Sequence, residues 1–394
     1  MPGSYIVAGA RTPIGKLSGA LASLTAMDLG GVAIKAAMER AGVRPDQVDL
    51  VFMGQVILAG TGQVPARQAA IKAGIPLSVP ANTVNKACLS GLNTILLADL
   101  HISAGLADVV VAGGMESMTA APYLLPNARS GFRYGHTQLS DAILHDGLEC
   151  AVEGCQMGAA TERDAARAGI PRSVMDEVAA KSHERAAAAI KEGRFEAEIV
   201  PVPVPQRKGD PVLVDTDEGV RPGTTAESLS KLKPAFAPEG NVTAGNASQI
   251  SDGASAVIVA SEAAVERLGL TPLGQLVSFG QVAGPEDLSL LRQPSAAILQ
   301  ALERAGKTVG DLDLIEINEA FAAVSYASME HLGVSDEIVN VNGGAVALGH
   351  PVGMSGNRLA LTLLHELRRR GGGLGAAGLC GAGGQGDAAI FRTV

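Results

Sequence analysis

The sequence is poor in aromatic residues, and this scarcity limits the surfaces that the protein can offer. Its 394 residues include no Trp, and aromatic residues make up only 3% of the chain. Proteins that bind single-stranded nucleic acid usually stack the bases on aromatic side chains. The formal net charge is −9, which disfavours binding by neutralisation of backbone phosphates. We therefore expect no nucleic-acid partner.

Cysteine is also scarce, and no apolar run is long enough to cross a bilayer. The cysteines at positions 88, 150, 155 and 380 form neither a C-x-x-C pair nor a Cys/His cluster with metal-ligand spacing. The first residues lack the basic and apolar segments of a secretory signal. We expect a cytoplasmic protein without metal or membrane partners, whose cysteines are buried or reactive thiols.

The residues that are abundant favour an α/β fold. Apolar residues make up 47% of the chain, and there are 49 glycines, a composition typical of helices that pack closely on buried sheets. The length predicts two or three domains.

An internal repeat divides the chain. The paired segments are Ala37–Gly42 with Ala301–Gly306, Val48–Val51 with Leu312–Ile315, and Ser90–Gly91 with Ser355–Gly356. Each copy predicts a helix closed by a glycine (Gly42 or Gly306), a strand (Leu50–Phe52 or Leu314–Ile317), a second helix (about Leu89–Ser103 or Asn357–Arg368) and an apolar strand (Val109–Gly114 or Gly375–Gly384). This order predicts duplicated α/β halves with parallel sheets, which meet around one site.

The segment between the halves, about residues 119–250, differs in character. Its stretch Pro201–Asp210 predicts a hairpin and a loop, and Arg172–Ile190 predicts an exposed, Ala-rich helix. We interpret this segment as an insertion that lies over the site.

Cys88 is the first candidate for chemistry. It directly precedes the apolar helical pattern of Leu89, Leu92 and Leu96, and a thiol at a helix N-terminus is expected to have a lowered pKa. The ordinary alternative is a small buried side chain. The repeat argues against that alternative, because the other copy has Gly353 at this position.

His350 is the second candidate, and it lies in the glycine-rich stretch Asn342–Gly356. Glycines on both sides and Pro351 predict a rigid loop, which favours a base for a thiol over an ordinary buried histidine. His101, His183 and His365 fall on predicted helices, where the ordinary interpretation applies.

Cys380 and Asn318 complete the set. Cys380 opens a G-x-G-x-x-G match at Gly381–Gly386, but only eight residues follow it, too few for a dinucleotide-binding unit. We expect a tight turn that presents the thiol. Asn318 ends the predicted strand of the second copy, and is either a helix N-cap or a donor to a reacting oxygen.

Cys88, Asn318–Phe321, Gly349–Pro351 and Cys380–Gly384 together resemble the motifs of the thiolase family, and most resemble its biosynthetic acetyl-CoA acetyltransferase branch. The resemblance extends from Val7 to the C-terminus. It implies a five-layered α/β/α/β/α fold. The implied domains are an N-terminal core of residues 1–118 and 251–271, a loop domain of residues 119–250, and a C-terminal core of residues 272–394.

The resemblance also implies a role for each motif residue. Cys88 matches the nucleophile that takes an acyl group from a thioester, and His350 matches the base that activates it. Cys380 matches the thiol that moves a proton at the α-carbon of the second acetyl-CoA, and we expect its pKa to lie near the operating pH. Asn318 matches the residue that holds a water in one oxyanion hole. The backbone N–H groups of Cys88 and Ala382 match the other, provided that Ala382 has a negative φ.

Further family positions line the coenzyme A channel: Leu148, Met157, Arg221, Ser228, Phe236, Ala244, Ser248 and Phe321. The implied substrates are acetyl-CoA, acetoacetyl-CoA and CoA, with no resident cofactor and no metal. The implied assembly is a homotetramer, a dimer of dimers, with residues about 119–145 at a tetramer contact.

Two departures from the family pattern affect the expected acyl specificity. Gln156 stands where some biosynthetic members have His, and Leu290 stands at a methionine position beside the acyl pocket. A 3-ketoacyl-CoA thiolase for longer chains is therefore an alternative, and a non-catalytic lipid carrier is a second one. A ketoacyl synthase of the same superfamily is disfavoured by Cys380 and by the Asn318–Phe321 motif.

Overall fold

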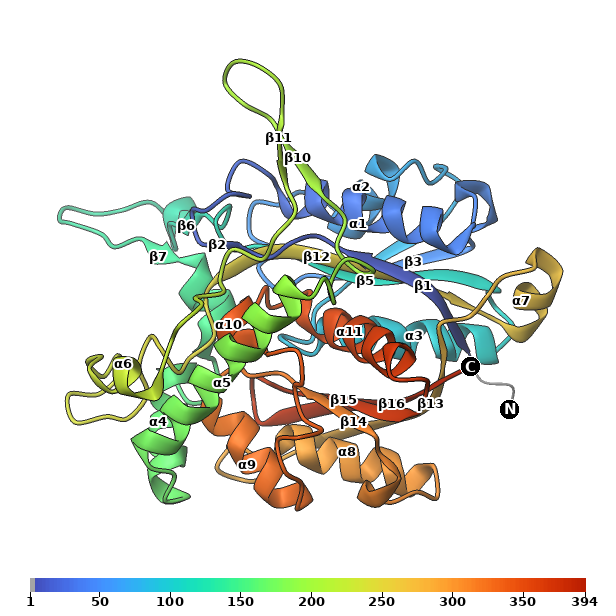
Figure 1. Ribbon diagram of the computed structural model, residues 1–394. Coiled ribbons are helices and arrows are strands. Elements are labelled where there is room, and N and C mark those ends of the chain that lie inside the picture. Colours follow the sequence, from blue (N-terminus) through green and yellow to red (C-terminus); the bar gives the residue numbers. More distant parts are fainter. Residues whose placement is uncertain (1–3) are drawn as a thin grey trace.

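The computed structural model describes residues 4–394 and contains two similar halves (Figure 1). The strands of the first half are β1 (Tyr5–Arg11), β2 (Gly15–Lys16), β3 (Leu50–Gly54), β4 (Ala81–Val84), β5 (Val109–Ser117) and β12 (Ser251–Ala260). Its helices are α1 (Ala26–Ala41), α2 (Pro65–Lys72), α3 (Ser90–Ser103), α7 (Glu262–Leu268) and a short 3-10 helix at Pro45–Gln47.

The second half repeats this plan. Its strands are β13 (Gly274–Ala283), β14 (Leu314–Ile317), β15 (Leu374–Gly381) and β16 (Gln385–Thr393). Its helices are α8 (Gln293–Arg304), α9 (Ala322–Leu332), α10 (Ala345–Leu348), α11 (Ser355–Arg369) and a 3-10 helix at Val309–Asp311. The predicted second helices thus begin at the repeated Ser-Gly pairs, and the start of α11 lies two residues before the prediction.

The repeat is visible in the strand order. The first half runs β1-β12-β5-β3-β4 and the second runs β13-β16-β15-β14, and the two orders join where β1 pairs with β13. Figure 1 shows α1 and α2 on one outer face, α3 and α11 between the two sheets, and α8 and α9 on the other outer face. This is the predicted five-layered arrangement.

The prediction of parallel sheets was only partly right. β3 pairs in parallel with β4 and β5, and β14 pairs in parallel with β15. The pairs β5–β12, β1–β12, β15–β16 and β13–β16 are antiparallel. The physical reason is visible at β15–β16, where a three-residue turn joins the strands and a parallel crossover would need far more chain.

The central helices pack with almost no space between their first turns. A Cβ atom on Gly91 would lie 2.8 Å from the Gly353 oxygen, and one on Gly356 would lie 2.5 Å from the Leu92 nitrogen. Both glycines are therefore required for this close approach. The crossing places the segments before α3 and α11 beside each other.

The intervening segment forms several small elements. They are β6 (Tyr123–Leu124), a 3-10 helix (Ala128–Ser130), β7 (Ser140–Asp141), a π-helix (Ile143–Leu148), β8 (Glu149–Cys150), β9 (Cys155–Gln156), α4 (Met157–Arg167), α5 (Arg172–Lys191), β10 (Val202–Val204), β11 (Val212–Val214) and α6 (Ala226–Ser230). The predicted hairpin is present as β10–β11. The prediction that the helix over Arg172–Ile190 is exposed was wrong for one face, because Met175, Ala179 and Ala186 of α5 are buried.

Gly306 also differs slightly from its predicted place. α8 ends at Arg304 with Ala305 as its C-cap, and Gly306 follows with φ 63°. Gly42 caps α1 directly with φ 67°.

Candidate active site

One cavity of about 500 Å³ lies where the two halves and the intervening segment meet. The predicted residues that line it are Cys88, His350, Cys380, Ala382, Leu148, Met157, Arg221, Phe236, Ala244, Ser248 and Phe321. Gln156 and Leu290, the two departures from the family pattern, line it as well. The structure thus brings together residues that are up to 294 positions apart in the sequence.

Cys88 lies at a tightly fixed turn. Ala87, directly before it, has φ 48°, a left-handed conformation that is rare for a residue with a side chain. The Ala87 N–H donates to Oδ1 of Asn85, and the Leu89 N–H donates to the oxygen of Lys86. The turn therefore presents the half-buried Cys88 at the start of α3.

The expectation of a lowered pKa for Cys88 was wrong. Burial raises the pKa of the Cys88 thiol to about 12, and the nearby Glu116 carboxylate acts in the same direction. Loss of hydration of a thiolate in this cavity outweighs the favourable effect of the helix terminus. The resting group is a thiol, so a base must take its proton during a reaction.

His350 is oriented to act as that base. Nδ1 of its ring lies 2.6 Å from Oγ of Ser355, and the Ser355 hydroxyl donates to the oxygen of Pro351. Because the hydroxyl proton is already used, Nδ1 carries the proton of the ring and Nε2 carries the lone pair. Burial lowers the pKa of His350 to about 3, and the Arg358 guanidinium adds to the effect. The imidazole is therefore neutral and able to accept a proton near pH 7.

Asn318 contacts His350 and does not cap a helix. Phe321 is the N-cap of α9, whereas Nδ2 of Asn318 lies 3.3 Å from Nε2 of His350. Oδ1 of Asn318 is buried and has no hydrogen-bond partner among the described residues. A buried polar atom of this kind is usually satisfied by a water or a ligand.

Cys380 lies at the end of β15, in a turn that matches the prediction for its glycines. Gly383 and Gly384 have φ 74° and 67°, whereas Ala382 does not adopt a positive φ. The condition placed on Ala382 is therefore met. The expectation of a Cys380 pKa near neutrality was wrong, because burial and the nearby Cys88 raise it well above its usual range.

Two predicted residues, Asn318 and Ser228, lie outside the cavity lining, and of these Asn318 contacts the lining residue His350. Ser228 is exposed on α6, where its N–H donates to Oγ1 of Thr225 and its hydroxyl donates to the Thr225 oxygen. These bonds cap a helix. Its proposed contact with a substrate therefore rests on the family resemblance alone.

Sequence reasoning missed a cation at the cavity. Lys16 lines it together with Arg221, and no Asp or Glu among the described residues does so. This charge balance favours an anionic ligand. Nothing local in the sequence connects Lys16, which lies on β2, with the cavity.

Glu116 and the Arg358–Glu316 pair were also missed. Glu116 is fully buried and accepts hydrogen bonds from the N–H groups of Val56, Ile57 and Gly353. Its carboxylate thereby joins the loop after β3 to the loop that carries His350. Nη1 of Arg358 lies 3.1 Å from Oε2 of Glu316, with both side chains buried.

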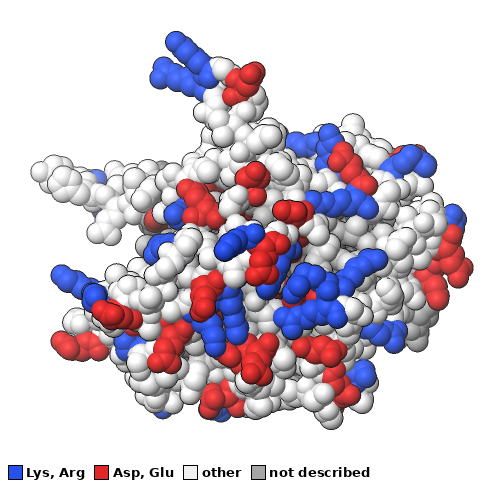
Figure 2. Space-filling view, viewed as in Figure 1, with Lys and Arg blue, Asp and Glu red and all other residues white. Residues whose placement is uncertain are grey.

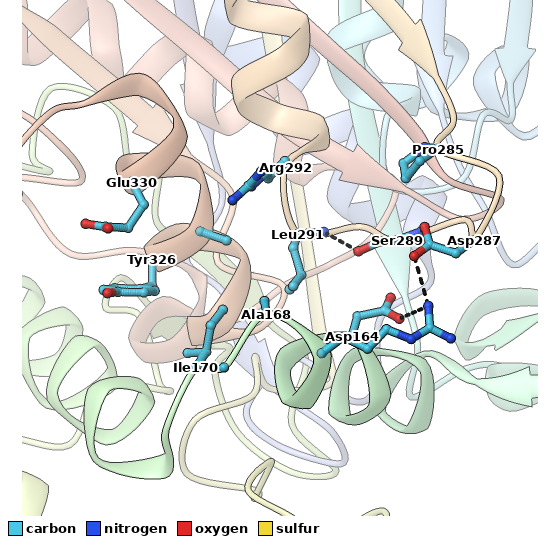
Figure 3. A pocket seen from close by; sticks show the side chains of 13 residues that line it. Asp164, Ala168, Ile170, Pro285, Asp287, Ser289, Leu291, Arg292, Tyr326 and Glu330 are labelled. Atoms are coloured by element: carbon cyan, nitrogen blue, oxygen red, sulfur yellow. Dashed lines mark hydrogen bonds and ion pairs between the residues drawn. The ribbon is translucent and has the colours of Figure 1, made fainter.

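A second cavity of about 450 Å³ lies on another part of the surface (Figure 3). Leu291 and Asp287 line it, whereas the adjacent Leu290 lines the first cavity. Arg167 pairs with Asp287 at 2.9 Å. The segment around Leu290 therefore forms part of the walls of both cavities.

The face drawn in Figure 2 shows no large area in which all the charged residues have the same sign. Lys and Arg are interspersed with Asp and Glu, including at the tip of the projecting β10–β11 hairpin (Figure 2). Among residues 4–394, no helix is both long and apolar enough to cross a membrane.

Two family models match the chain: the thiolase N-terminal domain over residues 4–263 and the thiolase C-terminal domain over residues 270–393. Probable acetyl-CoA acetyltransferases of Mycolicibacterium smegmatis and Mycobacterium tuberculosis are 56% and 55% identical, covering 98% and 100% of this chain and 100% of each relative. The acetyl-CoA acetyltransferase of Cupriavidus necator is 53% identical over 97% of both chains. The crystal structure of the Bacillus anthracis acetyl-CoA acetyltransferase matches with a TM-score of 0.97 at 39% identity, over 100% of this chain and 99% of that chain. The chain therefore belongs to the thiolase family of acyltransferase enzymes.

Proposed function

We propose that the protein is an acetyl-CoA C-acetyltransferase, which condenses two acetyl-CoA molecules to acetoacetyl-CoA and CoA and catalyses the reverse thiolysis. The observation that carries this proposal is the convergence of Cys88, His350 and Cys380 on one cavity whose charged lining residues, Lys16 and Arg221, are both cationic. Two thiols and a neutral base are what a two-step acyl transfer requires. The cations suit the phosphates of coenzyme A.

In the first step, Sγ of Cys88 attacks the thioester carbonyl and its proton passes to Nε2 of His350. The bond to the CoA sulfur breaks, and Cys380 supplies the proton that this leaving sulfur needs. The raised pKa of Cys380 suits this role, because it keeps the thiol protonated until the leaving group forms. The backbone N–H groups of Cys88 and Ala382 would stabilise the tetrahedral oxyanion.

In the second step, the Cys380 thiolate removes a proton from the α-carbon of a second acetyl-CoA. The carbanion attacks the acetyl carbonyl on Cys88, the bond from carbon to Sγ breaks, and His350 returns its proton to the sulfur. The enolate oxygen of the second acetyl-CoA would face His350 and a water held by Asn318, whose buried Oδ1 lacks a partner among the described residues. Coenzyme A thioesters are substrates in this scheme, and the scheme uses no resident cofactor or metal.

Mass spectrometry after mixing with acetyl-CoA alone tests the proposal. The wild type should carry one acetyl group on the Cys88 peptide, release CoA and form acetoacetyl-CoA. Cys88→Ala should remain unmodified. Cys380→Ala is the matched control: it should still be acetylated, more slowly because the leaving sulfur lacks this proton donor, but should form no acetoacetyl-CoA.

The alternative is a 3-ketoacyl-CoA thiolase for longer chains, and the observation that favours it is Leu290 in the cavity wall. An unmodified Cys88 together with cleavage of longer 3-ketoacyl-CoAs would support this alternative. Absence of both reactions would support a non-catalytic lipid carrier.

We also propose a cytoplasmic homotetramer, formed as a dimer of dimers. Leu77 and Leu106 are 71% and 73% exposed, and the loop of residues 119–145 exposes Tyr123, Phe132 and Leu139. Apolar side chains in such numbers on a surface favour contacts between copies. Light scattering coupled to gel filtration would test this assembly, and a monomer would refute it.

A further inference from the structure

The hairpin β8–β9 contains two of the four cysteines of the chain. Cys150 lies directly opposite Cys155 in the antiparallel ladder, and Glu149 lies opposite Gln156. Side chains of directly opposed residues lie on the same face of a ladder. In antiparallel ladders the Cα atoms of directly opposed residues are generally about 4.5 to 5.5 Å apart, a spacing within the range of about 4.4 to 6.8 Å that a disulfide bond requires.

We propose that Cys150 and Cys155 form a redox site, at which a low-molecular-weight disulfide oxidises the two thiols to an intrachain disulfide bond. The pairing already supplies the geometry, so the backbone does not need to rearrange. A hydrogen bond from the Gly154 N–H to the oxygen of Cys150 and φ 65° at Gly154 fix the turn between them. Both cysteines are free thiols in this structure.

The two thiols differ in accessibility, and this difference sets the order of the reaction. Cys150 is 2% exposed, whereas Cys155 is partly exposed. The Cys155 thiolate attacks one sulfur of the oxidant, whose S–S bond breaks and releases one small thiol. The Cys150 thiolate then attacks Sγ of Cys155 and releases the second small thiol. The protein thiols lose two protons and two electrons, which reduce the oxidant to two thiols.

The hairpin also forms part of the proposed substrate channel. Leu148 precedes it, Gln156 ends it and Met157 follows as the first residue of α4, and all three line the catalytic cavity. A Cys150–Cys155 bond would tie the segment before the hairpin to the start of α4. We infer that oxidation restrains this wall and changes the KM for CoA, while kcat is retained because Cys88 and His350 are untouched. This part of the inference rests on the proposed function.

Peptide mapping tests the bond itself and does not depend on activity. The protein is treated with glutathione disulfide in mildly alkaline buffer, because partial burial and the Glu153 carboxylate raise the pKa of Cys155. After denaturation, cleavage at Glu149, Glu153 and Glu162 separates peptide 150–153 from peptide 154–162. In the oxidised wild type, these two peptides should remain joined until a reductant is added.

Cys155→Ser and Cys150→Ser are the matched controls, and neither should yield the joined peptides. Each reduced variant should retain wild-type acetoacetyl-CoA thiolysis, which shows that it folds. Free peptides in the oxidised wild type, or a bond from either cysteine to Cys88 or Cys380, would overturn the assignment. Joined peptides with an unchanged KM for CoA would refute only the effect on the channel. Absence of thiolysis in every sample would count against the proposed function and leave the mapping result intact.

Discussion

The protonation state of Cys88 can be tested by the pH dependence of its alkylation. Iodoacetamide reacts with the thiolate, so its rate follows the thiolate fraction. With a pKa of about 12, this fraction is about 10⁻⁵ at pH 7, compared with roughly 3% for an ordinary cysteine with a pKa of about 8.5. The rate should rise about tenfold per pH unit, and therefore about 1000-fold from pH 6 to pH 9.

The assay uses the Cys380→Ala variant, in which Cys88 is the one remaining thiol among the cavity-lining residues. Alkylation of the Cys88 peptide is measured by mass spectrometry, with a small free thiol as the reference. The free thiol should reach its plateau above its pKa of about 8.5, whereas Cys88 should show none below pH 10.

Removal of the base separates the two reactions of Cys88. His350→Ala should leave the slope of alkylation unchanged, because iodoacetamide reacts with the thiolate in either protein. The same variant should slow acetylation by acetyl-CoA by about 10² to 10⁴-fold, the usual contribution of a general base. A rate of alkylation that is constant from pH 6 to pH 8 would refute this reasoning, since it would indicate a thiolate paired with a protonated His350.

Three further predictions concern packing and charge. Lys86→Met should lower the free energy of unfolding by about 3 kcal/mol, because it leaves the fully buried Asp387 without the ammonium group that lies 2.7 Å away. Urea titrations measure this loss, and a loss within the error of the titration would contradict the prediction. Gly356→Ala should destabilise the protein by about 1 to 3 kcal/mol, because the added Cβ atom would overlap with Leu92. The control is Gly310→Ala, which should be nearly neutral because its Cβ atom would have no neighbour nearer than 3.7 Å. Leu290→Ala should raise kcat/KM for longer 3-ketoacyl-CoAs relative to acetoacetyl-CoA by about tenfold or more. The control is Leu291→Ala, because Leu291 lines the second cavity. Equal selectivity in both variants would show that Leu290 does not limit chain length.

Acid should destabilise the fold through His350. Its pKa is about 3 in the folded protein and ordinarily 6.5, so the folded state prefers the neutral ring. This stabilisation is complete above pH 6.5 and is lost as the pH falls towards 3, by about 1.4 kcal/mol per unit. Urea titrations at pH 7 and pH 5 would measure the loss, and His350→Gln should show a smaller one. An identical pH dependence in both proteins would contradict the assignment.

The repeat was the feature of the fold that the sequence predicted best. Its paired Ser-Gly segments mark the starts of α3 and α11, and β14 has the predicted bounds Leu314–Ile317. Strand direction was less predictable, because it depends on how the chain returns to the sheet. An apolar run such as Leu374–Gly381 has the same composition whether its neighbour is parallel or antiparallel.

The candidate site shows a similar division. Motifs identified Cys88, His350 and Cys380, because residue type and glycine context are local properties. The pKa values of the thiols could not be predicted, because desolvation depends on side chains that distant elements bring to the cavity. Lys16 and the hydrogen bond from His350 to Ser355 were missed for the same reason, since each acquires its meaning only from the tertiary contact.

The duplication also explains why only one half carries a nucleophile before its central helix. Gly353 is the counterpart of Cys88 in the repeat, and a Cβ atom there would lie 2.8 Å from Oε2 of Glu116 and 2.8 Å from the oxygen of Met115. No cysteine can therefore occupy this position while Glu116 accepts the Gly353 N–H. The glycine lets the loop of His350 approach the first half closely. The two halves have thus diverged, so that the loop before α3 presents the thiol of Cys88 and the loop before α11 presents the base His350.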